Sequence, residues 1–414
     1  MRVLILGGGG REHALAWKLR QSARVERVLA LPGSDAMAAQ GVECVAGDAC
    51  EAAAVLAAVR AHNAGLTVVG PEAPLAAGVA DALRTAGCAV FGPSQKAARL
   101  ESSKIFAKEF MARHGIPTAR FAAVDTPAGA RQALRRFGGV AVLKADGLAA
   151  GKGVVVPATA WEAEAAAERL LAEYGRLVVE EKLTGRELSV LAISNGEQCV
   201  LLPPARDHKR LNEGDQGPNT GGMGAICGAG LMDAAAREAI QTRVVLPTLA
   251  ALEASATPFQ GVLYCGLMLN AAGPQVLEYN VRFGDPEAQA ILPCWHGDLA
   301  QVLSQAARGA ELDPGPDASL APWGACVVAA AEGYPGAPTR GDVIAGLDAT
   351  GQSPPALIFH ASTRRREGVW ETGGGRVLAS AATGATLPEA LAAGYRAFEA
   401  IHFRGMQWRR DIGR

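Results

Sequence analysis

The clearest chemistry in this chain lies in one short stretch that mixes acidic, amide and basic side chains. Residues 276–287 read Val-Leu-Glu-Tyr-Asn-Val-Arg-Phe-Gly-Asp-Pro-Glu, and their flanks predict a strand. Because side chains alternate faces along a strand, Glu278, Asn280 and Arg282 are expected on one face. The intervening side chains are expected on the opposite, apolar face: Leu277, Tyr279 and Val281.

The polar face of this predicted strand suits a metal that shares an anionic ligand. The carboxylate of Glu278 and the amide of Asn280 offer two oxygen ligands, and Mg²⁺ takes few protein ligands while sharing the rest with phosphates and water. Arg282, one step further, is placed to fork a carboxylate or phosphate. A polar edge strand with a solvated salt bridge is the alternative that this stretch alone leaves open.

A glycine-rich segment, residues 7–13, reads Gly-Gly-Gly-Gly-Arg-Glu-His between a predicted strand and a predicted helix. Glycines there let backbone N–H groups approach a phosphate at the helix N-terminus, and Arg11 beside them fits a sugar phosphate. A dinucleotide fingerprint would need glycine at Glu12 and an acidic end to the second strand, which instead ends Leu-Pro-Gly at 31–33. We expect His13 to be a structural hydrogen-bonding group rather than a base.

A second glycine-rich segment, residues 144–153, reads Lys-Ala-Asp-Gly-Leu-Ala-Ala-Gly-Lys-Gly after another predicted strand. A Walker A motif would need glycine at Asp146 and Ser or Thr at Gly153, so that motif is excluded. A flexible loop with cations at both ends can still fold over a triphosphate. A β-hairpin turn with two incidental lysines is the alternative.

Two further segments are candidates for binding. Residues 178–187 read Val-Val-Glu-Glu-Lys-Leu-Thr-Gly-Arg-Glu, which could form the edge of an adenosine pocket, although acidic turns are common. Residues 207–210 read Asp-His-Lys-Arg, and residues 217–224 read Gly-Pro-Asn-Thr-Gly-Gly-Met-Gly. So long a glycine-rich loop in a compact domain is usually functional, and its cations and N–H groups suit anionic substrates.

Composition narrows the class of protein. The chain has 414 residues, which predicts two to four domains, and its Lys+Arg count of 40 against an Asp+Glu count of 41 gives no electrostatic signature of nucleic-acid or membrane binding. Eight cysteines occur without a Cys-x-x-Cys pair, so the sequence signals neither a zinc site nor a redox pair. We find no apolar run of about 18 residues or more and no secretory signal, and we expect a reduced, cytoplasmic protein.

The N-terminal region alternates short apolar strands with alanine-rich helices, which predicts a doubly wound parallel sheet. Strands are expected at residues 3–6, 28–31, 66–69 and 89–91, and helices at residues 12–20, 51–62 and 75–86.

A helix starting near Ser102 leads into a small second lobe and then a larger body. The small lobe and its exit are expected to have strands at 121–124, 140–145, 154–156, 177–181 and 188–193, with a helix at 161–171. The body is expected to have a helix at 234–253 and strands at 262–269 and 275–281. The Pro-, Gly- and Asp-rich residues 311–322 indicate a linker. The last helix is indicated by apolar residues at helical spacing: Leu391, Tyr395, Phe398 and Ile401.

Together these segments resemble the ATP-grasp family and, within it, the phosphoribosylamine–glycine ligases, also called glycinamide ribonucleotide synthetases. The resemblance covers nearly the whole chain and also rests on Val-Gly-Pro-Glu-Ala-Pro-Leu at 69–75 and Phe-Gly-Pro at 91–93. The 144–153 loop and the Glu278/Asn280 pair are general to the fold. The runs at 9–13, 69–75 and 217–225 are close to diagnostic for these ligases.

The resemblance implies an α/β architecture with an α+β ATP-binding part. It implies a Rossmann-like N-terminal domain at 1–101, a two-lobed ATP-grasp domain at 102–322 with a small mobile lobe at about 118–186, and a small C-terminal domain at 323–414. The chain departs from the family pattern at three segments and one residue: Ala172–Gly175, Ile226–Gly228, Cys294–Gly297 and Lys182.

The resemblance also implies roles for individual residues. ATP would be bound by Lys104, Lys144, Gly147, Gly151, Lys152, Gly153, Glu180, Glu181, Leu183 and Glu187. Catalysis would depend on Arg282, Asp207, Lys209 and Asn219. The other substrates would be bound by Gly10, Arg11, Glu12, Glu72, Thr220, Gly221, Gly222, Met223 and Asp285. Mg²⁺ or Mn²⁺ would be held by Glu278 and Asn280.

The implied reaction is an ATP-dependent ligation of glycine to 5-phosphoribosylamine through glycyl phosphate, which gives glycinamide ribonucleotide in purine biosynthesis. The expected protein is a monomer without nucleic-acid or membrane partners, in transient contact with the enzyme that supplies phosphoribosylamine. Another ATP-grasp ligase or carboxylase is the main alternative, and it should lack the 217–225 loop. A nicotinamide oxidoreductase is disfavoured by Glu12 and Pro32, and a non-catalytic ATP-binding regulator would release no ADP.

Overall fold

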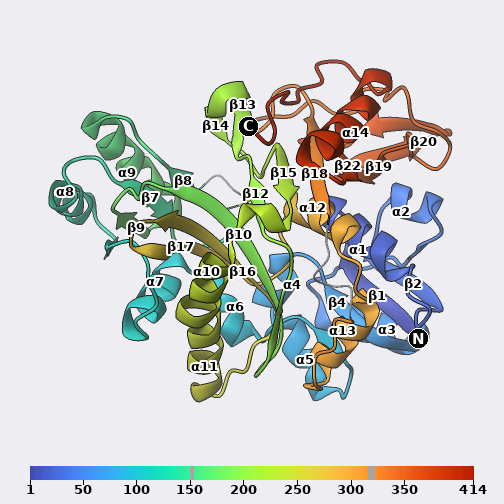
Figure 1. Ribbon diagram of the computed structural model, residues 1–414, viewed down its shortest axis with the longest axis horizontal. Coiled ribbons are helices and arrows are strands. Elements are labelled where there is room, and N and C mark those ends of the chain that lie inside the picture. Colours follow the sequence, from blue (N-terminus) through green and yellow to red (C-terminus); the bar gives the residue numbers. More distant parts are fainter. Residues whose placement is uncertain (150–152, 316–321) are drawn as a thin grey trace.

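The computed structural model describes most of the chain, namely residues 1–149, 153–315 and 322–414. Three strands of a large antiparallel sheet run through the middle of the molecule: β10 (Arg186–Asn195), β16 (Gln260–Asn270) and β17 (Gly273–Asn280). Figure 1 shows the N-terminal region, in blue, on one side of these strands and a small lobe, in blue-green, on the other. The expected α/β fold with an N-terminal parallel sheet is confirmed.

The N-terminal sheet has five parallel strands in the order β3-β2-β1-β4-β5. They are β1 (Arg2–Gly7), β2 (Arg27–Pro32), β3 (Glu43–Cys44), β4 (Ala64–Val69) and β5 (Val90–Phe91). Val3 to Leu6 are all buried, as expected for a parallel strand covered on both faces. The four predicted strands are confirmed, and the short β3 was not predicted.

Five helices belong to this region: α1 (Gly10–Leu19), α2 (Asp35–Ala39), α3 (Ala52–Ala61), α4 (Glu72–Ala76) and α5 (Val79–Thr85). The single helix predicted at 75–86 is wrong. Gly78 interrupts it with φ 81°, a left-handed conformation that ends one helix before the next begins. As a result, α4 is a separate short helix with Glu72 as its first residue.

Two helices lead from this region to the small lobe: α6 (Gln95–Ser102) and α7 (Lys104–Arg113). Each begins after a serine cap, and the Ser103 hydroxyl accepts a hydrogen bond from the Phe106 N–H at 3.1 Å. The lobe has a four-stranded antiparallel sheet covered by two helices: β6 (Phe121–Val124), β7 (Val142–Ala145), β8 (Val154–Val155), β9 (Leu177–Glu180), α8 (Pro127–Arg136) and α9 (Ala160–Tyr174). It has its own apolar core.

The large sheet continues from β10, β16 and β17 into the C-terminal region. Its described strands run in the order β17-β16-β10-β12-β15-β18-β22-β19, with β11 also paired to β10. The additional strands are β11 (Cys199–Leu201), β12 (Ala205–Asp207), β15 (Gly224–Cys227), β18 (Trp323–Ala330), β19 (Leu357–His360) and β22 (Arg376–Gly384). Since β15 pairs directly with β18, the two regions share one sheet.

Helices and hairpins complete the fold. The predicted 234–253 helix is present as three consecutive helical segments, with the middle one a π-helix: α10 (Ala234–Ile240), η3 (Gln241–Val245) and α11 (Leu246–Ala254). The remaining elements are α12 (Glu287–Cys294), α13 (Leu299–Ala307), α14 (Leu387–Ala400), β13 (Arg210–Asn212), β14 (Gln216–Asn219), β20 (Thr363–Arg366), β21 (Val369–Thr372), η1 (Glu213–Asp215) and η2 (Ala229–Leu231).

The predicted linker, 311–322, is described only in part. Residues 311–315 form neither helix nor strand, and residues 316–321 lie outside the described residues. Two of the segments that depart from the family pattern meet in the core, where the Sγ atoms of Cys227 and Cys294 lie 3.3 Å apart. Among the described helices, none combines the length and the apolar character needed to cross a membrane.

Candidate active site

A large pocket of about 1000 Å³ lies where the N-terminal region, the small lobe and the large sheet meet. Its walls come from α6, α7, the small sheet, β10, β16, β17, and the segment between β12 and β15. We call this last segment, residues 207–224, the central loop. The pocket lining includes both cationic and anionic side chains from segments far apart in the sequence.

One end of the pocket is built around a buried carboxylate in the small sheet. The two oxygens of Glu180 each lie 2.5 Å from an ammonium group, that of Lys108 on one side and that of Lys144 on the other. Lys144 also donates to the carbonyl of Leu277 at 2.8 Å. Burial and the neighbouring Lys144 lower the pKa of Lys108 to about 8, against the opposing effect of Glu180. Lys104, from α7, donates to the carbonyl of Gly147 at 3.0 Å.

The metal-ligand pair predicted on β17 lines the pocket, but the predicted alternation is wrong at one position. Gly266 pairs with Glu278 while Leu267 pairs with Val276, so Leu277 is an extra residue in a β-bulge. Leu277 therefore lines the pocket beside Glu278 and Asn280 instead of facing the core.

Glu278 and Asn280 fit a divalent cation. The Glu278 side chain is 29% exposed and accepts no hydrogen bond from the described residues, and its nearest cation is Lys209 at 3.8 Å. Burial opposes its ionisation, yet Lys209, Lys144 and Lys104 together lower its pKa. An ionised carboxylate with free oxygens next to an amide oxygen is a donor set that suits a hard divalent cation such as Mg²⁺.

Arg282 follows β17 and is enclosed by acids from two helices. Its guanidinium lies 2.8 Å from Glu101 of α6, 3.4 Å from Glu72 of α4, and 3.2 Å from the amide oxygen of Asn280. Burial opposes the charge of Arg282, but Glu101 and Glu72 raise its pKa. Arg282 thus stays a cation at the point where the N-terminal region meets β17.

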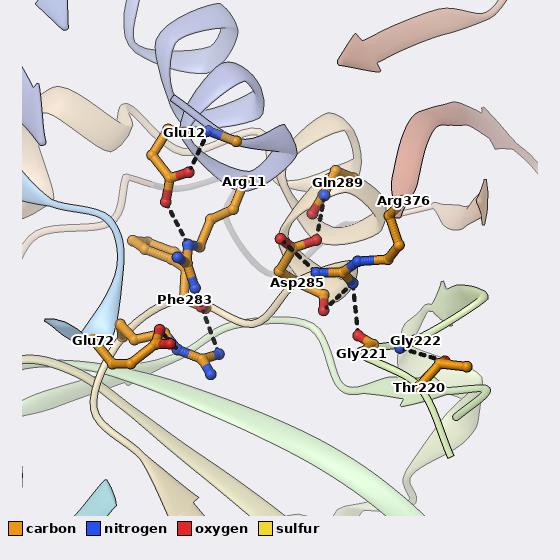
Figure 2. Close-up of polar contacts among 12 residues, drawn as sticks. Arg11, Glu12, Glu72, Thr220, Gly221, Gly222, Phe283, Asp285, Gln289 and Arg376 are labelled. Atoms are coloured by element: carbon orange, nitrogen blue, oxygen red, sulfur yellow. Dashed lines mark hydrogen bonds and ion pairs between the residues drawn. The ribbon is translucent and has the colours of Figure 1, made fainter. Parts of the chain in front are cut away.

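The central loop is held from the C-terminal region. Arg376 of β22 donates to the carbonyls of Gly221 at 2.6 Å and Asp285 at 2.8 Å, and it pairs with the Asp285 carboxylate at 3.0 Å. Figure 2 shows Arg376 and Gln289 converging on Asp285 while Gly221 lies next to the same guanidinium. The Gly221 N–H donates to the hydroxyl of Tyr334 at 2.9 Å.

Lys209 connects the central loop with strands β10 and β17. Its ammonium lies 3.7 Å from Glu187 of β10 and 3.8 Å from Glu278 of β17. Although burial opposes its charge, Glu278 and Glu187 raise its pKa. The Thr220 hydroxyl donates to the Lys209 carbonyl at 2.8 Å, and this hydrogen bond joins the two ends of the central loop.

The glycine-rich turn at 7–13 directs its arginine into the pocket and its glutamate away from it. Arg11 donates to the carboxylate of Glu12 at 2.6 Å and to the carbonyl of Phe283 at 3.1 Å (Figure 2). Glu12 caps its own helix by accepting the Gly9 N–H at 2.8 Å. His13 accepts the N–H of His360 at 3.0 Å on its Nδ1 and lines a separate cavity, which agrees with its expected structural role.

Most of the residues expected at the site line the pocket together: Arg11, Glu72, Lys104, Lys144, Gly147, Gly153, Glu180, Glu181, Leu183, Glu187, Asp207, Lys209, Asn219, Thr220, Gly221, Glu278, Asn280, Arg282 and Asp285. Four others are buried behind its walls: Gly10, Glu12, Gly222 and Met223. Gly151 and Lys152 lie outside the described residues, so their expected contact with ATP stays a prediction.

The sequence reasoning missed several polar residues of the pocket wall: Glu101, Lys108, Tyr264, Glu287 and Arg376. Glu287 closes the Arg-Phe-Gly-Asp-Pro-Glu run that had been noted, so its position could have been found. Lys108 lies one helical turn after Lys104 on the same helix, which is a weaker signal. Arg376 comes from an unremarkable strand about 90 residues after Asp285, and only the fold brings it in.

Models of three domains of one protein family match nearly the whole chain. The phosphoribosylglycinamide synthetase N domain matches residues 1–101, its ATP-grasp (A) domain residues 102–288, and its C domain residues 324–414. Curated relatives include phosphoribosylamine–glycine ligases from Rhodopirellula baltica, 44% identical over 99% of this chain and 96% of the relative, and Allochromatium vinosum, 45% identical over 100% and 98%.

Solved structures give the same result. The phosphoribosylamine–glycine ligase of Thermotoga maritima is 35% identical and superposes with a TM-score of 0.87 over 100% of both chains. The biotin carboxylase of Campylobacter jejuni, described as a β,γ-ATP complex, is 15% identical and has a TM-score of 0.72 over 98% of this chain and 92% of its own, which shows a shared fold only. With three domain models in order and full-length relatives of this identity, the chain belongs to the phosphoribosylglycinamide synthetase family of ATP-grasp enzymes.

Proposed function

We propose that this enzyme uses ATP to join glycine to 5-phosphoribosylamine, giving glycinamide ribonucleotide, ADP and phosphate. The observation that carries the proposal is one pocket of about 1000 Å³ whose lining residues carry both the lysines and acids of a nucleotide site and the glycine-rich central loop. In the first step the glycine carboxylate attacks the γ-phosphate of ATP to form glycyl phosphate. In the second, the sugar amine displaces phosphate.

The roles of individual residues are part of the proposal. Lys104 and Lys144 neutralise ATP phosphates, and the Glu180–Leu183 segment and Glu187 contact the nucleoside. Glu278 and Asn280 hold Mg²⁺ or Mn²⁺, which supplies positive charge to the phosphate oxygens when bound. No covalent protein intermediate is needed, because charge neutralisation and positioning supply the rate of phosphoryl transfer.

Substrate binding on the opposite wall is proposed for a second group of residues. Arg11 and Arg282 bind anionic groups, with Glu72 holding Arg282 in place, and Asn219, Thr220 and Gly221 of the central loop line the same pocket. Ordering three reactants in one pocket can supply up to roughly 7–11 kcal/mol of the barrier.

We propose the domain division 1–101, 102–322 and 323–414, with the small lobe at about 118–186 as the mobile part. A monomeric state, a cytoplasmic location and a transient contact with the enzyme that supplies phosphoribosylamine complete the proposal. All eight cysteines are free thiols, which supports a reducing compartment.

The test is ADP release by the purified protein, with phosphoribosylamine generated in situ and each reactant omitted in turn. We expect ADP release to require glycine, the sugar amine and a divalent cation. Bicarbonate, the substrate of an ATP-grasp carboxylase, should not replace glycine. ADP release that ignores glycine would refute the proposed function.

A further inference from the structure

Two carboxylates meet at one corner of the pocket where no metal role has been assigned. Asp207 ends β12 and Glu287 begins α12, and both line the pocket. Gly222 lies against both segments, because a Cβ added there would lie 2.7 Å from Oδ1 of Asp207 and 2.4 Å from Cδ of Pro286, the residue before Glu287. Its φ of 110° and this close approach both favour glycine.

The two carboxylates differ in their hydrogen bonding. Glu287 is satisfied, since its Oε1 accepts from the Tyr264 hydroxyl at 2.7 Å and the Ser189 hydroxyl at 3.3 Å. Asp207 has its Oδ1 buried with no hydrogen-bond donor among the described residues. A carboxylate that lacks donors beside a second carboxylate has a strong affinity for a proton.

The charges around Asp207 also increase its affinity for a proton. Burial and the negative charge of Glu287 raise the pKa of Asp207 well above its usual range. Lys209 and Arg376 oppose this shift, and Glu187 adds to it. The group is therefore a better proton acceptor than an ordinary aspartate at the same place.

Other acids and bases near this corner already have partners. Glu72 pairs with Arg282, and Asp285 pairs with Arg376. His208 accepts the Gly413 N–H at 3.0 Å on its Nε2, and burial lowers its pKa to about 4, which makes it a weak proton acceptor. Among the described residues of this corner, Asp207 remains as an acid whose Oδ1 accepts no hydrogen bond.

We propose that Asp207 accepts the proton that the sugar amine loses in the ligation step, and that Glu287 positions it for this role. The inference rests on the proposed function and deepens it. The nitrogen lone pair attacks the carbonyl carbon of glycyl phosphate, the bond from carbon to the phosphate oxygen breaks, and inorganic phosphate leaves. The N–H proton passes to Asp207, and the new bond is the amide.

Hydroxylamine separates this step from the activation of glycine. Hydroxylamine can trap glycyl phosphate as the hydroxamate and release its proton to buffer, so trapping does not need the proposed acceptor. We expect Asp207→Asn to lower ligation with phosphoribosylamine about 100-fold or more, as for loss of a general base. Glycine-dependent hydroxamate formation should fall less than about threefold.

A second variant and a matched control keep the test decisive if Asp207→Asn folds poorly by circular dichroism. Glu287→Gln should reduce ligation, leave trapping unchanged and move the acid limb of the ligation pH profile to lower pH, because a negative neighbour of Asp207 is gone. Asp125→Asn, an exposed aspartate of the small lobe, should change neither reaction.

The remaining outcomes all overturn the proposal. Equal loss of both reactions in Asp207→Asn would show that Asp207 binds or activates glycine instead, and retention of both would show no role. An unshifted pH profile in Glu287→Gln would remove the coupling between the two acids. If the wild-type protein forms no glycine-dependent hydroxamate, the proposed function itself fails, which is a different result.

Discussion

Replacing Glu180 with glutamine should damage the protein more than removing the lysine beside it. Lys108 and Lys144 each lie 2.5 Å from Glu180, and the three side chains are at most 6% exposed. Glu180→Gln would leave two buried ammonium groups facing each other without a counter-charge. Removing one partner of a buried ion pair costs about 3–5 kcal/mol.

The pKa of Lys108 limits this loss. Burial and Lys144 already lower it from 10.5 to about 8, so Lys108 can release its proton when Glu180 loses its charge. From a pKa of about 8, releasing this proton in the folded protein at pH 7 spans about one pH unit and costs about 1.4 kcal/mol, so the loss should stay toward the lower end of that range.

Lys108→Met should be milder, at about 1–2 kcal/mol, because Lys144 and Glu180 remain as a neutral pair, although the contact of Lys108 with Glu180 and its hydrogen bond to Thr118, at 2.7 Å, are both lost. The double variant should be more stable than Glu180→Gln alone, with a coupling energy of about 1–3 kcal/mol.

The assay is urea unfolding of the wild type, the two single variants and the double variant at pH 7, with the KM for ATP measured on each. We expect Glu180→Gln to raise the KM for ATP, since Lys144 loses the carboxylate that orients it. If the losses in the free energy of unfolding of the two single variants sum to that of the double variant within about 0.5 kcal/mol, Lys108 and Glu180 are not energetically coupled and the reasoning is wrong.

Four further predictions follow from the site and its supports. Glu278→Ala should abolish turnover and leave thermal unfolding unchanged, because no described residue donates a hydrogen bond to that carboxylate; near-normal activity would disprove its role. Arg282→Ala should also abolish turnover, but it should lower the free energy of unfolding by about 3–5 kcal/mol, since Glu101 would lose a buried partner at 2.8 Å. Burial lowers the pKa of His208 from 6.5 to about 4, so the unfolded chain takes up this proton first and stability falls as the pH drops from 6.5 to 4, by roughly 3 kcal/mol; His208→Gln should flatten this slope in urea unfolding. Arg409→Ala should raise the KM for the sugar amine more than the KM for ATP, because Arg409 donates to the carbonyl of residue 210 in the central loop at 3.1 Å; equal changes would contradict this.

The sequence predicted the fold where local patterns determine it. The apolar runs at 3–6 and 66–69 are strands of the parallel sheet because both faces are buried, and the alternation of strands and helices leaves few other arrangements. The failures come from single residues whose conformation the periodicity does not encode. Gly78 adopts a left-handed conformation and divides a helix, and Leu277 forms a bulge that changes the face of a strand residue.

The site shows the same division between local and long-range information. Motifs identified Lys144 and Glu278 because their chemistry is carried by short runs, and both line the pocket. Glu12 belongs to such a run, yet its carboxylate caps its own helix and stays behind the pocket wall. A motif marks a segment of the chain, but which side of the segment faces the pocket depends on the backbone around it.

The C-terminal region was expected as a small separate domain, and its contacts make it a support of the active site. Strand β15 follows the central loop and pairs with β18 in an antiparallel register that places Ala225 opposite Cys326. Arg376 and Tyr334 hold both backbone polar groups of Gly221, the carbonyl and the N–H. These contacts orient the central loop, which carries residues proposed to bind substrate. Substitutions in the C-terminal region should therefore change the rate of ligation by moving this loop. No local pattern around residue 376 could have shown this.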